Sequence, residues 1–434
     1  MSTRPIVRLR RPIAIAPATS TRVVHFGSDA GHLPGSVLVG APPDSPRFGS
    51  REVGWRIGGR DSARTRWMRD AACGRSGLLC VAARRLTGAR TAARRAVSSS
   101  SAFEVVHARS ALAALELLAA CGRSTAVGNL VVSIGGGEIG RAVVSTDWLR
   151  ALRRVFDAAD VLVVDSELAR RLAIGCGAPR ERVRVVPTAV ELHAIAASGP
   201  RAGVATIAAE NPRETGTRRG AALRLLACGP LVEREGIQVA IEALACLRGA
   251  ARAGRSREPN VELRVLGRGP ELRALKALAR HLEVGSAVRW LGPIDDATLL
   301  AELRRCDAFL GPGVIAADGD RDTDLAPATL IAMAAAVPVI LRRSHGDREE
   351  LRDGHDVWMW EARDPADDAA TLAERIDALV PGASENRAVG ARGRARLEHS
   401  RAAVRLAAAW DAAIEGATAQ ETATARLSRV ATSS

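Results

Sequence analysis

The sequence contains no tyrosine and a single lysine, Lys276, and aromatic residues make up only 3% of it. Nearly all of its positive charge is therefore arginine, a bias that is typical of GC-rich coding sequences. Binding of single-stranded nucleic acid uses aromatic side chains as stacking platforms among the basic residues, and this chain has no such interleaving. The formal net charge of +14 therefore does not by itself predict a nucleic-acid partner, and we expect none.

Long apolar runs are also missing. The apolar stretches are too short, or too often interrupted by arginine, to span a bilayer. The run from Ile13 to Ala18 near the N-terminus is short and contains Pro17, so we expect no secretion signal. With 47% hydrophobic residues, the 434-residue chain is expected to be soluble and globular, with two or three domains.

Cysteine pairs at metal-binding spacing are absent. The seven cysteines are widely spaced, no CxxC motif occurs, and most of them lie in apolar runs. We therefore expect buried free thiols in a reducing compartment, with neither a zinc site nor disulfide bonds.

The positive charge is concentrated in one segment. Residues 1–100 carry 18 arginines and 5 acidic residues, a net charge of +13, whereas the rest of the chain has a net charge of +1. A basic segment of this kind suits anionic lipid or a phosphorylated substrate. We expect a cytoplasmic protein, with contact to the inner membrane face through the arginine-rich residues 47–95 as one alternative.

Short strands alternate with helical segments along most of the chain, which predicts parallel α/β domains. One series of expected strands comprises 21–26, 105–107, 131–134, 160–164 and 182–186, and a second comprises 223–228, 261–266, 287–291, 308–310 and 338–341. The resulting division is an extended arm (1–20), an N-terminal domain (21–193, with an arginine-rich and poorly patterned part at 21–102), a linker (194–221), a C-terminal domain (222–395), a closing helix (396–415) and a flexible tail (416–434).

The stretch from Asp318 to Trp358 has the most distinctive pattern. An acidic loop containing Gly319 leads into an apolar helical run from Leu325 to Ala336, and a short strand ends at Leu341. In a parallel sheet, ligand chemistry is expected in the loops at the carboxyl ends of the strands.

This stretch resembles the donor-sugar signature of family 4 retaining glycosyltransferases, especially the colanic-acid-biosynthesis-like members. The matching residues are Asp318-Gly319-Asp320-Arg321, Ala332-Met333-Ala334, Val337-Pro338-Val339, Gly346, Glu349 and Asp353-Gly354. The phrases VVHARSALAA, VVSIGGGEIGR, ADVLVVDSELARRL and ERVRVVPTAVEL resemble the family's N-terminal domain. The resemblance covers residues 103–380. It implies the α/β fold called GT-B, with two Rossmann-like domains and an interdomain cleft, a nucleotide-sugar substrate and no metal cofactor.

The resemblance also implies donor-binding residues. Those near the nucleotide and its diphosphate are Gly229, Arg234, Gly267, Arg268, Gly269, His345, Gly346 and Glu349. Each of these residues also fits a purely structural role. Residues 229–236 are typical of a strand-to-helix turn, and a GxG pattern suits any tight turn. His345 resembles an ordinary surface histidine, and Glu349 resembles a residue that anchors its loop.

Catalytic candidates follow from the same resemblance. The first of two family glutamates aligns with Asp322 if one residue is inserted, so that Asp322 or Asp324 takes its place. His107 matches a histidine of the family, next to Arg109. A solvated acidic loop is the alternative for the aspartates. A calcium-binding EF-hand loop is excluded because Thr323 and Thr329 stand where glycine and glutamate are required.

Four positions depart from the family pattern. Pro230 and Glu235 replace the expected Arg and Lys, Ile331 replaces the second glutamate, and Gly135 stands where a histidine is frequent. A carboxylate at position 235 repels a diphosphate instead of attracting it. Two functions therefore remain open. One is a hexosyltransferase that uses a UDP- or GDP-sugar and a glycan or lipid-linked acceptor in polysaccharide biosynthesis. The other is an impaired pseudo-glycosyltransferase that acts as a binding or regulatory partner.

Overall fold

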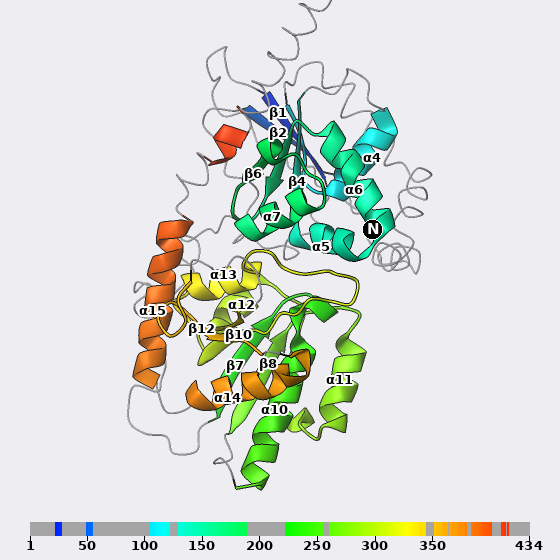
Figure 1. Cartoon of the computed structure of the whole chain (residues 1–434). Coiled ribbons are helices and arrows are strands. Elements are labelled where there is room, and N and C mark those ends of the chain that lie inside the picture. Colours follow the sequence, from blue (N-terminus) through cyan, green and yellow to red (C-terminus); the bar gives the residue numbers. More distant parts are fainter. Residues whose placement is uncertain are drawn as a thin grey trace, which may run out of the picture.

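The protein consists of two α/β domains, one above the other in Figure 1. The computed structural model describes residues 22–27, 49–54, 105–121, 129–188, 222–254, 260–343, 351–362, 364–379, 383–401, 409–413 and 415. The predicted arm, linker and tail lie outside these ranges. Each domain contains a six-stranded sheet.

The N-terminal sheet has the strand order β2-β1-β3-β4-β5-β6, and every pairing is parallel. Its strands are β1 (Arg22–Gly27), β2 (Gly49–Gly54), β3 (Val105–Ala108), β4 (Asn129–Ile134), β5 (Val161–Val164) and β6 (Val183–Val185). Its helices are α4 (Ala111–Cys121), α5 (Gly136–Val144), α6 (Thr146–Ala158) and α7 (Glu167–Gly175). The sequence did not predict β2 or α5.

Side-chain caps explain where these helices begin. Ser145 accepts a hydrogen bond from the Trp148 N–H at the start of α6, and Ser166 does the same for Ala169 in α7. Glu138 in the first turn of α5 accepts hydrogen bonds from the N–H groups of Ala111 and Leu112. One carboxylate thus fixes the starts of α4 and α5 relative to each other.

The C-terminal sheet has the order β12-β11-β10-β7-β8-β9 and is also parallel. Its strands are β7 (Leu223–Cys228), β8 (Val261–Leu266), β9 (Val288–Gly292), β10 (Ala308–Gly311), β11 (Val339–Arg342) and β12 (Trp358–Trp360). The predicted limits of β7 and β8 are confirmed, whereas β12 was not predicted. The strand order reverses between β7 and β10, and open α/β sheets bind ligands at such a reversal, beyond the carboxyl ends of the strands.

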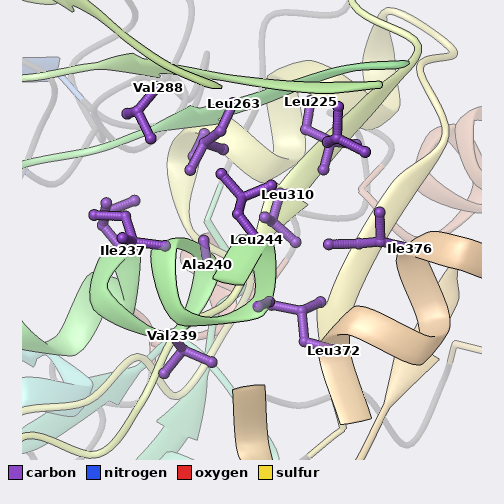
Figure 2. Packing of buried hydrophobic residues seen from close by; sticks show 14 of the residues in the cluster. Leu225, Ile237, Val239, Ala240, Leu244, Leu263, Val288, Leu310, Leu372 and Ile376 are labelled. Atoms are coloured by element: carbon purple, nitrogen blue, oxygen red, sulfur yellow. The ribbon is translucent and has the colours of Figure 1, made fainter. Parts of the chain in front are cut away.

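Helices cover both faces of this second sheet. On one face, α10 (Ile237–Arg252), α11 (Leu272–His281) and α14 (Asp368–Leu379) bury side chains against β7, β8 and β10. Figure 2 shows this core, to which Leu244 and Leu372 of the helices and Leu225 and Leu310 of the strands belong. On the other face, α12 (Asp296–Leu303) and α13 (Pro327–Ala334), which is buried from Ala328 onward, pack against the alternate strand residues, such as Leu226 and Phe309.

Helix α15 (Ala383–Ser400) runs along the side of the C-terminal domain in Figure 1 and passes through the predicted boundary at 395/396. A β-carbon at Gly390 would collide with the carbonyl oxygen of Ala336, so this glycine allows α15 to approach the end of α13. Beyond α15, residues 409–413 are helical, and Trp410 packs on the N-terminal sheet with Val131 and Val163. Residues 409–413 therefore contact the N-terminal domain, although they follow a helix of the C-terminal domain.

Four of the seven cysteines have side chains that the structure describes. Cys176, Cys228 and Cys306 are free and buried, as predicted, but Cys246 on α10 is exposed. Throughout the part of the chain that the structure describes, no helix combines the length and apolar character needed to cross a membrane.

Candidate active site

The acidic loop after β10 lies between the two domains. Arg141 of α5 donates from Nε to Asp318 at 2.9 Å and from Nη2 to Asp320 at 2.6 Å. Three glycines of α5 permit this approach. A β-carbon would collide with Thr323 at Gly136, with Asp320 at Gly137 and with the Gly319 carbonyl group at Gly140. The glycine-rich start of α5 thus forms the contact surface for the loop.

Arg234 meets the same loop from the C-terminal domain. Its Nη1 lies 3.1 Å from Asp320 Oδ2, and its Nε lies 3.6 Å from Asp322 Oδ1 and 3.5 Å from Glu235 Oε1. Burial acts to lower the pKa of Arg234, but the surrounding carboxylates outweigh it and raise that pKa. Arg234, which the family resemblance assigned to the donor diphosphate, is therefore present at this site, where it already interacts with three carboxylates.

Glu235 occupies the turn where the family resemblance implies a lysine. The turn is a short 3-10 helix, Glu233–Glu235, and the Glu235 carboxylate lies where a β-carbon of Gly229 would be. Burial, together with the negative charge of Asp322, raises the pKa of Glu235 to about 8. Gly229 therefore provides room for a carboxyl group that tends to keep its proton near neutral pH.

Asp322, Asp324 and Glu235 line a small cavity at the carboxyl ends of β7, β10 and β11. Its volume is about 20 Å³, room for roughly one water molecule. Asp324 is only 5% exposed. Its Oδ1 pairs with Arg401, and its Oδ2 is buried without a hydrogen-bond partner. Asp320 is 7% exposed, so the alternative of a solvated acidic loop is wrong for these two residues.

Two further contacts join the loop to the N-terminal domain. The Thr323 hydroxyl donates to Asp165 Oδ1 at 2.7 Å, at the end of β5. Burial and the nearby Asp324 raise the pKa of Asp165 to about 7. Arg401, which pairs with Asp324, also donates to the Thr188 carbonyl group at 3.3 Å. The sequence did not single out Asp165, Arg141 or Arg401, because their partners are more than 70 residues away along the chain.

His107 lies apart from this cluster of charges. Its ring is 2% exposed, its Nε2 is 2.7 Å from Ser133 Oγ, and its edge meets the Trp410 ring at a centroid distance of 4.7 Å. A catalytic role for His107 stays a prediction, and Trp410 covers this ring in the structure.

The other predicted donor residues fall into three groups. Gly267 and Gly269 let their loop approach the turn after β7, because β-carbons there would collide with the carbonyl groups of Gly229 and Leu231. Arg268, between them, is exposed and close to the same turn, since its carbonyl group accepts a hydrogen bond from the Leu231 N–H. His345, Gly346 and Glu349 lie outside the described residues.

Ile331 lies on α13. Its side chain is fully buried in the core beneath the sheet, with Leu330 and Met333 of the same helix. The position that aligns with the family's second glutamate therefore supplies packing in this chain and faces no ribose.

The region that contains the cavity and the acidic loop matches a known family. The match covers residues 222–380, and the family is described as glycosyl transferases group 1. These residues are a glycosyl transferases group 1 domain. The domain thus includes the β7–β10 reversal, Arg234, Glu235 and the whole of the acidic loop, and the resemblance inferred from the motifs is confirmed.

The chain is also similar to curated proteins that are named as glycosyltransferases of polysaccharide biosynthesis. A putative colanic acid biosynthesis glycosyltransferase of Escherichia coli is 26% identical over 63% of this chain and 60% of its own length. An amylovoran biosynthesis glycosyltransferase of Erwinia amylovora is 26% identical over 62% of this chain and 60% of its own. The chain thus spans about three-fifths of the length of these curated relatives.

Solved structures identify the fold. Anabaena HepE, in complex with UDP, superposes with a TM-score of 0.63 at 14% identity, over 91% of this chain and 99% of that one. Sucrose-phosphate synthase from Thermosynechococcus elongatus superposes with a TM-score of 0.58 at 16% identity, over 76% of this chain and 79% of that one. The fold is GT-B, as the sequence predicted.

Proposed function

We propose that the protein is a glycosyltransferase that moves a hexose from a UDP- or GDP-sugar to a glycan or lipid-linked acceptor in polysaccharide biosynthesis. The observation that carries this proposal is the cavity at the β7–β10 reversal, with the acidic loop held over it against α5. Ligand sites of doubly wound sheets lie at such reversals. The relatives named for polysaccharide biosynthesis, and HepE in complexes with UDP and UDP-glucose, support the same donor class.

The residues of this site take distinct roles in the proposal. Arg234 lies within the turn after β7, and Arg268 lies in the loop whose backbone bonds to that turn; both would face the donor diphosphate. Asp322 and Asp324 line the cavity and would accept hydrogen bonds from sugar hydroxyl groups. Since the cavity holds about one water molecule, the acidic loop must move away from α5 before a donor can enter.

Turnover of donor sugars tests this function. We expect the full-length protein to release UDP or GDP from one of a panel of hexose donors, and an extract of lipid-linked glycans to increase the rate. Asp324→Asn should reduce this release at least tenfold, whereas Asp147→Asn on the exposed face of α6 should leave it unchanged. Release by the wild type that Asp324→Asn leaves unaltered would contradict the assigned site.

A second function is favoured by the turn after β7, where Glu235 and Pro230 replace both expected cations. It is a pseudo-glycosyltransferase that binds a partner without turning over a donor. Absence of turnover by the wild type, with turnover gained in Pro230→Arg/Glu235→Lys, would establish it. Ile331 should be left unchanged in this variant, because a glutamate there would bury a charge in the core.

We also propose that the arginine-rich segment 47–95 holds the protein at the inner membrane face, which would bring it to a lipid-linked acceptor. The net charge of +13 over residues 1–100 supports electrostatic attraction to anionic lipid. Flotation with vesicles that contain phosphatidylglycerol should recover the protein at low salt and lose it at high salt. Equal recovery with neutral vesicles would contradict this placement.

A further inference from the structure

The N-terminal and C-terminal domains meet at a hydrogen bond between Asp165 and Thr323. Asp165 follows β5, and its Oδ1 accepts the hydroxyl group of Thr323 from the acidic loop at 2.7 Å. The start of α5 packs against the same contact, because a β-carbon at Gly136 would collide with Thr323. Thr323 is only 1% exposed. This contact across the domain boundary is therefore closely packed and has little access to water.

Two more carboxylates of the acidic loop lie close to Asp165. Asp322 and Asp324 flank Thr323 in the sequence, and the negative charge of each acts on Asp165. Asp324 is itself buried, and its Oδ2 has no hydrogen-bond partner among the described residues. Negative charges repel each other more strongly in a buried site than in water, because the effective dielectric constant is lower. Ionisation of Asp165 therefore opposes the contact that its hydrogen bond supports.

Asp165 has no ion pair within the described part of the chain. Its hydrogen-bond donors are the hydroxyl groups of Thr323 and Ser166. The arginines at this boundary pair with the carboxylates of the loop instead. Besides the loop aspartates, the charged groups on the elements packed around the contact are Glu138 and Arg141 of α5, Glu167 and Arg170 of α7, Arg401 after α15, and Asp411 in the helical residues 409–413.

We propose that Asp165 is a proton-controlled switch between the two domains: the acidic loop stays docked on the N-terminal domain while Asp165 is protonated, and it is released when Asp165 ionises. Burial, together with the charge of Asp324, raises the pKa of Asp165 to about 7 in the docked form. Release exposes the carboxyl group to water and returns its pKa toward the ordinary value of 3.8. The contribution of this group to docking is therefore complete below pH 3.8 and is lost as the pH rises through about 7.

Two other buried carboxyl groups titrate within a single domain. Burial and the charge of Asp322 raise the pKa of Glu235 to about 8, and its neighbours Asp322 and Arg234 belong to the same C-terminal domain. Burial also raises the pKa of Glu138, which accepts hydrogen bonds from backbone N–H groups of α4 in the N-terminal domain. The domains can separate without changing these contacts. Asp165 meets the loop of the opposite domain, so its protonation depends on docking.

Release of the loop would change access to the cavity. The loop carries Asp322 and Asp324, which line the cavity of about 20 Å³ at the carboxyl ends of β7 and β10. We therefore expect access to this place to increase from acidic to mildly alkaline pH. The switch goes beyond the proposed function, because it acts on the two domains whether or not a donor sugar is turned over.

Hydrogen–deuterium exchange of the full-length protein at pH 6 and pH 8.5 tests this switch. The rates of peptides that cover residues 318–324 are corrected for the intrinsic pH dependence of exchange with an unfolded reference. A pKa of about 7 in the docked form and 3.8 in the released form predicts that protection falls roughly tenfold between these pH values. Asp165→Asn keeps an acceptor oxygen for Thr323 without a charge, so its loop should stay protected at both. Asp147→Asn on the exposed face of α6 is the control and should respond as the wild type does.

Each outcome decides for or against the switch. Loss of protection in the wild type and Asp147→Asn that Asp165→Asn prevents supports it. The same loss in Asp165→Asn would assign the titration to another group and overturn it. Equal protection of the wild type at both pH values, or a loop of Asp165→Asn that is unprotected at both, would also overturn it. A loss that extends to β7 and β8 would reveal general unfolding and would likewise contradict the switch. None of these outcomes depends on nucleotide binding, so the switch and the proposed function are tested separately.

Discussion

At the scale of single residues, the acidic loop is stabilised by groups that titrate near neutral pH. Asp165 accepts the Thr323 hydroxyl group across the domain boundary, and burial raises its pKa to about 7. A carboxyl group with a raised pKa in the folded state favours folding when it is protonated. Its stabilising contribution is therefore complete below the ordinary pKa of 3.8 and is lost as the pH rises through about 7.

Asp165→Asn should reveal this dependence. The amide oxygen can still accept the Thr323 hydroxyl group, and the cost of ionising a buried carboxyl group disappears. We expect the variant to melt higher than the wild type at pH 8, with a smaller difference at pH 5, as measured by circular dichroism. Asp147→Asn on the exposed face of α6 is the control and should show no such pH dependence. A difference that is larger at pH 5 would contradict the raised pKa.

Individual site residues were only partly predictable from the sequence. Arg234, Asp322 and Asp324 do come together at one cavity, but Asp165, Arg141 and Arg401 were missed. Sequence patterns report local spacing, and these partners meet only because two domains fold and pack. The burial of Asp320 and Asp324 was missed for the same reason, since a run of alternating aspartates normally indicates a solvated loop.

At the scale of elements, α5 and the acidic loop form one packed unit. Glycine normally weakens a helix, yet Gly136, Gly137 and Gly140 all lie within α5. Their positions are explained by the acidic loop, whose backbone at Gly319 and side chains of Asp320 and Thr323 occupy the space that side chains on α5 would need. The sequence could not predict α5, because its glycines locally disfavour a helix. The segment that explains these glycines, the acidic loop, is distant along the chain.

Gly140→Ala tests this unit. Alanine favours a helix over glycine by roughly 0.5–1 kcal/mol, but here its β-carbon would collide with the Gly319 carbonyl group. Overpacking of this kind costs typically ~1–3 kcal/mol, so we expect a lower melting temperature and a loosened loop. Gly135→Ala is the matched control, because a β-carbon at that position has no neighbour within 4 Å. Stabilisation by Gly140→Ala would show that α5 does not contact the loop in this way.

The same reasoning applies to α15, which the sequence did not predict as one helix. Gly390 and Gly393 lower its helix propensity, and both pack against backbone carbonyl groups, of Ala336 and Asp356.

The strands were easier to predict. Both β7 and β8 are short, largely apolar and mostly buried runs, so their limits could be located to the residue.

At the scale of the whole molecule, ion pairs of Arg141 and a hydrogen bond of Arg401 join the two domains beside the cavity. Arg141 connects α5 to Asp318 and Asp320, and Arg401 connects Asp324 to the Thr188 carbonyl group. The two-domain GT-B architecture was predictable from the alternation of strands and helices. The arrangement of the two domains relative to each other depends on these contacts, and it was not predictable from the sequence.

Arg141→Gln should loosen the closed arrangement. Hydrogen bonds to charged groups contribute ~1.5–3 kcal/mol each, so loss of this guanidinium group should shift the molecule toward a more open form. Small-angle X-ray scattering should show a larger radius of gyration than for the wild type. Arg150→Gln is the control, because Arg150 is exposed and its ion pair among the described residues is with Asp147, three positions earlier in the same helix. An unchanged radius in Arg141→Gln would mean that other contacts keep the domains closed.

The most direct test of the donor site is calorimetric titration of the full-length protein with UDP and GDP. A site at the β7–β10 reversal predicts micromolar binding of one of the two nucleotides. It also predicts weaker binding in Asp324→Asn, which removes a carboxylate from the cavity. Absence of heat of binding for both nucleotides at millimolar concentration would contradict a working donor site and would leave the pseudo-glycosyltransferase as the function.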